Sequence, residues 1–211
     1  TIGAFPMAFS PINLANVAAG TGGFVINGQD AHDRSGFSVA SAGDVNGDDF
    51  DDLIIGARSG DGVGNAKYGA GESYVVFGKS TWLATLDPGA LDGTNGFMLV
   101  GTDSHDFSGA SVSGAGDVNG DGFSDLIISA PSAAAAANAK FIAGESYLVF
   151  GGNFTNSVTH LGTTGADTLT GTAGADSEVG GRGDDTLIGN GGADVLYGGQ
   201  GDDVLAISDT T

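Results

Sequence analysis

Two nine-residue segments place oxygen-bearing side chains at a spacing that suits a hard cation. In the first, residues 44–52, carboxylates or an amide occupy places 1, 3, 5 and 9, and place 7 can add a backbone carbonyl. Calcium takes roughly six to eight oxygen ligands at about 2.4 Å. The spacing therefore predicts a calcium loop with side-chain ligands Asp44, Asn46, Asp48 and Asp52 and the carbonyl of Phe50.

A second segment repeats this pattern at residues 117–125. Its predicted ligands are Asp117, Asn119, Asp121 and Asp125 and the carbonyl of Phe123. An EF-hand begins in the same way but needs a bidentate glutamate at place 12, where this chain has Ile55 and Ile128. The other alternative is an ordinary Asp/Asn/Gly turn. Carboxylates crowded together without a basic neighbour would repel one another, which favours the calcium loop.

A different period, of nine residues, begins at Gly162 and runs through five consecutive units to Ala206. The eighth place of four units is leucine, and Glu178 occupies it in the second unit. The sixth place is always aspartate, at Asp167, Asp176, Asp185, Asp194 and Asp203.

The elements that must position the two loops form a longer repeat. Residues 20–80 align without a gap with residues 93–153, at an offset of 73. Runs rich in Val, Ile, Phe and Tyr, punctuated by Gly and Asp, predict four short strands in each copy. In the first copy we expect them at 24–28, 37–42, 52–57 and 73–77. A four-stranded unit of this length has the size of one propeller blade.

The motifs of both regions resemble known families. Gly36-Phe37-Ser38, then residues 43–48 and 52–57, resemble the FG-GAP repeat of integrin-α-type β-propellers. This resemblance implies a calcium loop between the strands of each repeat. The nine-residue units resemble the RTX nonapeptide repeat of secreted bacterial proteins, which forms a parallel β-roll.

The RTX resemblance implies that two units make one turn of the roll and that calcium is shared between turns. The pairs would be Asp167 with Asp185, Asp176 with Asp194, and Asp185 with Asp203, with glycine carbonyls completing each shell. Without metal, two carboxylates about 5 Å apart repel by roughly 3 kcal/mol at an effective dielectric constant of about 20. We therefore expect the metal-free roll to be loose or unfolded.

Glu178 breaks the roll pattern, because a carboxylate pointing into an apolar interior is costly to desolvate. We expect it to be exposed at the open end of the roll or turned toward the preceding region. The alternative is a one-residue slip that brings Val179 inward and disturbs the site of Asp176 and Asp194. His160, just upstream, is expected to be a structural residue of the connector.

The predicted fold class is all-β: two FG-GAP propeller-type blades, each a four-stranded antiparallel sheet, followed by a short parallel β-roll. The expected divisions are an FG-GAP region at 1–153, a connector at 154–161 and an RTX roll at 162–206.

Composition limits the function. With 26 acidic against six basic side chains the net charge is −20, which argues against nucleic acid and against anionic membrane surfaces as partners. No apolar stretch approaches the roughly 20 residues of a membrane span. Cysteine is absent, so a thiolate zinc site is excluded. We find no metalloprotease, nucleophile-elbow or phosphate-loop motif and predict that the chain is not an enzyme.

These features together predict a calcium-binding structural or adhesive module of a large bacterial surface protein exported by type I secretion. Extracellular calcium would fold it, since about five weak sites fill at extracellular calcium levels. We expect self-association or binding to other surface proteins. Two alternatives remain open: a propeller that binds a protein or a glycan, for which Trp82 and Tyr68 could stack on sugars, and a non-catalytic appendage of a secreted hydrolase.

Overall fold

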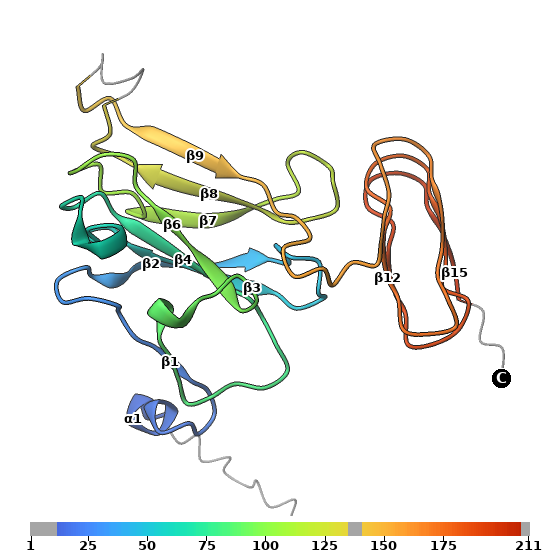
Figure 1. The fold of residues 1–211 in the computed structure, drawn as a ribbon, viewed down its shortest axis with the longest axis horizontal. Coiled ribbons are helices and arrows are strands. Elements are labelled where there is room, and N and C mark those ends of the chain that lie inside the picture. Colours follow the sequence, from blue (N-terminus) through green and yellow to red (C-terminus); the bar gives the residue numbers. More distant parts are fainter. Residues whose placement is uncertain (1–11, 135–140, 208–211) are drawn as a thin grey trace, which may run out of the picture.

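The computed structural model describes residues 12–134 and 141–207. Figure 1 shows two packed β-sheets at one side and a narrow coil of short strands at the other. A short helix α1 (Leu14–Ala18) precedes the sheets, and the Asn13 side chain caps it by accepting a hydrogen bond from the Ala15 amide at 2.9 Å. In the described ranges no helix is long and apolar enough to cross a membrane.

The first blade is a four-stranded antiparallel sheet. Its strands run in the order β2-β3-β4-β6: β2 (Ser35–Gly43), β3 (Asp52–Ala57), β4 (Glu72–Val76) and β6 (Gly96–Val100). Short 3-10 turns lie in its connections, η1 (Val63–Asn65) and η2 (Pro88–Ala90). All five residues of β4 are buried, because this strand has a neighbour on each side and packed layers around it.

The second blade has three strands among the described residues, where we expected four. They are β7 (Ser111–Gly116), β8 (Asp125–Ala130) and β9 (Glu145–Val149). The reason is that a blade takes its outer strand from the following repeat: β6 belongs to the second repeat but pairs with β4. The equivalent strand of the first repeat, β1 (Val25–Ile26), instead pairs in parallel with β5 (Thr85–Leu86).

The main core lies between the two blades. Ile54, Val75 and Phe77 of the first blade pack with Val112 and Leu126 of the second, and all are at most 5% exposed. The backbones also approach closely, since a Cβ at Gly56 would collide with the Gly109 carbonyl. The repeated apolar runs therefore become one buried interface.

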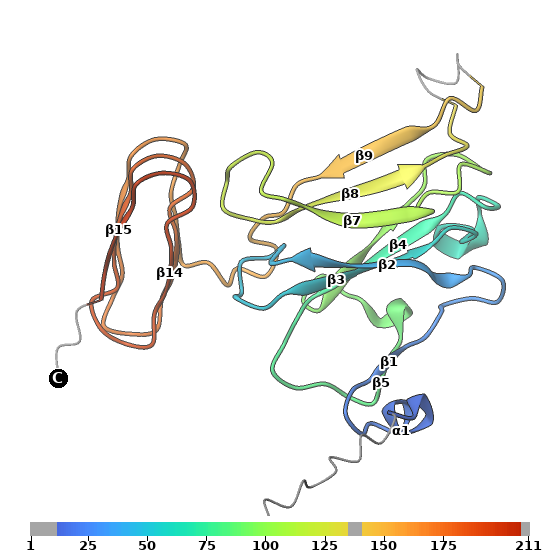
Figure 2. The same ribbon diagram turned by 180° about the vertical axis from the view of Figure 1, so that it is seen from behind.

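The C-terminal coil is a parallel β-roll, and its two sheets are clearest in Figure 2. One sheet contains β10 (His160–Leu161), β12 (Ser177–Val179) and β14 (Val195–Tyr197). The other contains β11 (Thr168–Thr170), β13 (Thr186–Ile188) and β15 (Val204–Ala206). Paired residues, such as Thr168 with Thr186, are 18 apart, so one turn consumes two nonapeptides.

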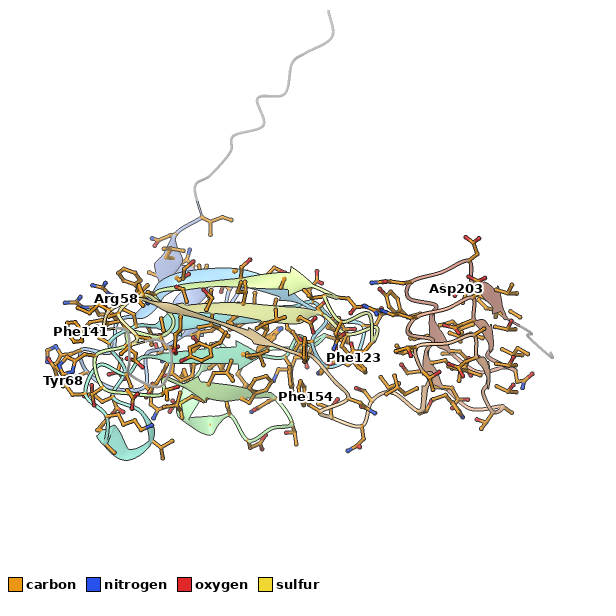
Figure 3. The ribbon with its side chains drawn as sticks, turned by 90° about the horizontal axis from the view of Figure 1, so that it is seen from above. Arg58, Tyr68, Phe123, Phe141, Phe154 and Asp203 are labelled. Atoms are coloured by element: carbon orange, nitrogen blue, oxygen red, sulfur yellow. The ribbon has the colours of Figure 1, made fainter. Side chains whose placement is uncertain are left out.

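The roll lies against the end of the blades that carries the two predicted calcium loops. Phe123, from the second loop, forms a small apolar cluster with Val158 and Val179. Figure 3 shows Phe123 at this junction and Arg58, Tyr68 and Phe141 at the opposite end of the blades. A Cβ at Gly122 would collide with Val179 of the roll, so loop and roll are in direct contact.

Candidate metal sites

The first predicted loop is organised by hydrogen bonds to its own acidic side chains. Asp44 accepts hydrogen bonds from the amides of Gly47 at 2.7 Å and of Asp49 at 3.0 Å. Both donors have positive φ, 77° and 70°, which turns the chain back on itself. The Asn46 amide group then donates to Asp48 at 2.9 Å. Places 1, 3 and 5 are thus gathered in one tight turn.

Asp52, at place 9, ties this turn to the sheet. Its side chain is fully buried and accepts hydrogen bonds from the amides of Val45 at 2.9 Å and Gly78 at 2.7 Å. Burial raises the pKa of its carboxyl group to about 7. Burial also raises the pKa of Asp44, against the lowering effect of the loop amides. The loop therefore holds carboxylates whose charge is poorly solvated, and a cation would stabilise that charge.

The second loop reproduces this arrangement. Asp117 accepts from the Gly120 amide at 2.6 Å and from the Gly122 amide at 3.1 Å. Asn119 donates to Asp121 at 2.7 Å. Asp125 is fully buried and accepts from the amides of Val118 at 2.7 Å and Gly151 at 3.0 Å. The same sequence pattern gives the same hydrogen bonds in both repeats.

Side-chain acids alone do not complete a metal shell. In residues 12–134 and 141–207 no group of three or more His, Asp or Glu side chains has the geometry of a metal site. Two observations nevertheless fit a cation in the loops: the first-loop carboxylates converge with no salt bridge to a basic side chain among the described residues, and an asparagine with a side-chain oxygen stands at place 3. The ligand assignments in both loops, including the carbonyls of Phe50 and Phe123, remain predictions.

In the roll, the structure brings the predicted aspartate pairs together. Asp185, Asp194 and Asp203 each accept a hydrogen bond, through Oδ1, from the amide of the aspartate one turn earlier. The three bonds are Asp167 to Asp185 at 2.7 Å, Asp176 to Asp194 at 3.0 Å and Asp185 to Asp203 at 2.9 Å. The aspartates therefore form two ladders, one along each edge of the roll.

The second carboxylate oxygen, Oδ2, differs between units. In the first two units a threonine at place 2 satisfies it: Thr163 donates to Asp167, and Thr172 to Asp176, each through its amide and its hydroxyl group. These bonds, the amide first, lower the pKa of both aspartates. The sequence contained this signal, since threonine occupies place 2 in these two units and glycine or asparagine in the others.

In the later units place 2 is not threonine, and buried oxygens lack a partner. Within the described part of the chain, Oδ2 of Asp185 and Oδ2 of Asp194 are buried and accept no hydrogen bond. Glycine at place 1 leaves the space for these carboxylates. A Cβ at Gly180 would lie 2.5 Å from Asp185 Oδ2 and would also collide with the Gly198 carbonyl. A buried carboxylate oxygen beside carbonyl oxygens is an environment that calcium satisfies, so the residues of the roll fit the ion.

Glu178 contradicts our expectation of exposure. Its side chain is fully buried, and it pairs in regular register with Leu196, so there is no one-residue slip. The rung between Asp176 and Asp194 consequently has ordinary geometry. Neither carboxylate oxygen of Glu178 has a hydrogen-bond partner among the described residues. Burial raises its pKa.

The partner of Glu178 is His160, which sequence reasoning assigned only a structural role. His160 lies beside Glu178 in the parallel pair β10–β12, with Nδ1 3.9 Å from Oε1. Its positive charge, when protonated, opposes the effect of burial on the Glu178 pKa. The sequence contained a signal for this contact: His160 and Glu178 are 18 residues apart, which is one turn of the roll.

Comparison with family models matches both regions. The FG-GAP repeat model matches residues 35–76 and 108–149. The model of the RTX calcium-binding nonapeptide repeat matches residues 161–177 and 179–205, and so is interrupted at Glu178. The structure is all-β, with antiparallel sheets in the first region and a parallel roll in the second.

Curated relatives match over the blade region. Integrin alpha-5 of Xenopus laevis is 32% identical over 110 residues, or 50% of this chain and 9% of the relative. Integrin alpha-PS2 of Drosophila melanogaster is 32% identical over 124 residues, or 56% of this chain and 8% of the relative. Integrin alpha-E of Mus musculus is 38% identical over 97 residues, or 45% of this chain and 8% of the relative. The match therefore spans less than a tenth of each relative.

The blade loops generate the first prediction. Replacing Asp44 or Asp117 by alanine removes both a charged oxygen and the acceptor that shapes the turn, so each variant should bind one calcium ion fewer than the parent chain. Isothermal titration calorimetry measures the stoichiometry. Asp49→Ala is the matched control, because it removes a charge from the same loop without removing a predicted ligand. Unchanged stoichiometry in both variants would show that the loops are ordinary turns.

Glu178 generates the second prediction. Glu178→Leu replaces a buried carboxylate that lacks hydrogen bonds, whose cost is roughly 1–3 kcal/mol, so the melting temperature of the calcium-bound roll should rise by several degrees. His160→Ala should lower the melting temperature, because Glu178 then loses its neighbouring imidazole. Thermal melting followed by circular dichroism measures both. A lower melting temperature for Glu178→Leu would mean instead that this carboxylate holds a metal ion.

Proposed function

Because the chain contains FG-GAP repeats followed by RTX calcium-binding nonapeptide repeats, we propose that it is a structural or adhesive module of a secreted bacterial surface protein. Calcium outside the cell would fold the roll and fix its position on the blades. RTX repeats are typical of secreted proteins, which supports an extracellular, cell-surface location. Both families are typically non-catalytic, and we propose no reaction for this chain.

The observation that carries this proposal is the pair of buried oxygens, on Asp185 and Asp194, that lack a hydrogen-bond partner in the roll. Their desolvation is costly unless a cation compensates for it. They occur in a chain of net charge −20, so the chain itself supplies few cations. Calcium binding and folding of the roll are then coupled, and the module would form only where calcium is plentiful.

The junction supports a mechanical role. The second loop contacts the roll through Phe123, and Val158 of the connector packs on the same ring. Gly47 of the first loop also lies against both side chains, since a Cβ there would come within 2.6 Å of each. Ions in the two loops would therefore stiffen the segment that carries the roll, which suits a module under tension at a cell surface.

A second candidate function is binding of a protein or a glycan at the opposite end of the blades. Tyr68 is 70% exposed there and lies 5.3 Å, between ring centroids, from His105. Trp82 is a poorer candidate, because Phe24 stacks on its ring at 4.1 Å and Lys79 lies over it at 4.6 Å. Glycan-array binding by a monomer, lost in Tyr68→Ala, would favour this function.

The third prediction tests the structural role. In millimolar calcium the chain should bind the ion, gain β-structure in the roll and self-associate at high protein concentration, whereas a calcium-free sample should do none of these. Circular dichroism follows the folding and light scattering follows the assembly. Magnesium at the same concentration is the control for ionic strength. A chain that folds fully without calcium would contradict the proposal.

A further inference from the structure

The outer edge of β9 is incomplete in the part of the chain that the structure describes. β9 pairs with β8 on one side, whereas its counterpart β4 pairs with both β3 and β6. The difference appears in exposure: Leu148 and Phe150 are 42% and 51% exposed, but the equivalent Val75 and Phe77 are 0% and 2% exposed. The second blade therefore presents an unpaired strand edge and uncovered apolar side chains.

The internal repeat specifies which segment fits that edge. β6, with the sequence Gly-Phe-Met-Leu-Val, covers β4 in the antiparallel register Val75 to Phe97 and Tyr74 to Met98. The offset of 73 makes residues 23–27, with the sequence Gly-Phe-Val-Ile-Asn, the equivalent of β6. These residues contain β1, which pairs with β5 alone.

The free edge of β1 is the one that this pairing requires. The amides of Val25 and Asn27 face β5, donating to Ala84 at 2.9 Å and Leu86 at 3.0 Å. Successive amides of a strand point to opposite sides, so the amides of Phe24 and Ile26 face away from β5.

In β6, the equivalent amides face β4. The Phe77 amide donates to the Asn95 carbonyl at 3.1 Å, and the Gly101 amide donates to the Gly71 carbonyl at 2.8 Å. By the same alternation, the amides of Phe97 and Leu99 point toward β4. Phe24 and Ile26 are the residues equivalent to these two.

Aromatic packing gives the same match. Phe97 lies between Phe154, at 5.2 Å, and Phe77, at 5.8 Å. Phe24 has one aromatic neighbour, Trp82, with ring centroids 4.1 Å apart. No second ring packs on Phe24 among the described residues. The residue equivalent to Phe77 is Phe150, which is half exposed.

The faces of the two blades are complementary as well. Inside the chain, the face of the first blade bearing Ile54 packs on the face of the second blade bearing Leu126. The opposite faces carry the equivalent residues: Ile127 of the second blade is 42% exposed and Leu53 of the first is 38% exposed, whereas Ile55 and Val76, on the same face as Leu53, are buried within the chain. The surface around Leu53 is therefore the part of this face that a second copy can present to Ile127.

We infer that β9 takes residues 23–27 of a second copy of this chain as its fourth strand. The pairing is antiparallel, with Tyr147 opposite Val25 and Leu148 opposite Phe24 of the second copy. It cannot form within one chain, because β1 and β9 lie at opposite sides of the paired blades (Figures 1 and 2). The contact is head-to-tail, so it can extend into longer assemblies. The inferred pairing rests on the proposed function, and it explains the self-association that we propose there.

Disulfide cross-linking tests the register, since the chain contains no cysteine. Tyr147 and Val25 form a non-hydrogen-bonded pair, in which side chains approach most closely. A mixture of Tyr147→Cys and Val25→Cys chains in calcium should form a mixed disulfide dimer about tenfold more than Leu148→Cys with Val25→Cys, whose side chains point to opposite faces. Equal cross-linking of the two mixtures, or none, would overturn the inference.

A second measurement avoids cysteine. Leu148→Asp places a charge on the uncovered face of β9, so sedimentation should show loss of the assemblies, whereas Val63→Asp, at an exposed site on η1, should leave them intact. Calcium binding is measured on the same samples. Assembly that survives Leu148→Asp would overturn the inferred contact while leaving the calcium-dependent module intact, whereas absence of calcium binding would refute the proposed function itself.

Discussion

Carboxylate oxygens held close together in turns, among backbone amides, constrain both the blade loops and the roll. Each blade loop folds around one aspartate, Asp44 or Asp117, that collects the amides of the residues after it. The roll stacks aspartates one turn apart, and the later three each accept a hydrogen bond from the amide of the aspartate one turn earlier. Amides orient these carboxylates but cannot neutralise their charge. We therefore expect the full arrangement to be stable only with cations present.

The way in which the charge is compensated differs along the roll. In the first turn of the roll, threonine hydroxyl groups at Thr163 and Thr172 satisfy the aspartates, and His160 lies beside the buried Glu178. Further along, Asp185 and Asp194 keep a buried oxygen without a donor. We therefore expect the first turn to need less metal than the following turns. Calcium would then extend the folded roll from this first turn.

Local sequence pattern was sufficient to predict the strands β3 and β4 and the period of the roll, because these depend on alternation and on a fixed repeat. The resemblance to the RTX repeat implied the pairing of its aspartates. It was insufficient where the outcome depends on contacts distant in sequence. The pairing of β6 with the first blade involves two repeats, so the sequence of a single repeat does not predict it. Among the described residues, this pairing leaves the second blade with three strands. The Glu178 side chain was expected to be exposed. It is buried, because the backbone register of the roll places Glu178 opposite Leu196.

Hydrogen exchange at the roll amides tests the dependence on calcium most directly. The amides of Thr186, Val195 and Val204 donate to the carbonyls of aspartates one turn away, so they report the closed roll. On removal of calcium, their exchange should accelerate by at least about a hundredfold, while the buried amides of β3 and β4 stay slow. Equal protection of the roll with and without calcium would contradict the account, because the carboxylate ladders would then be stable without a cation.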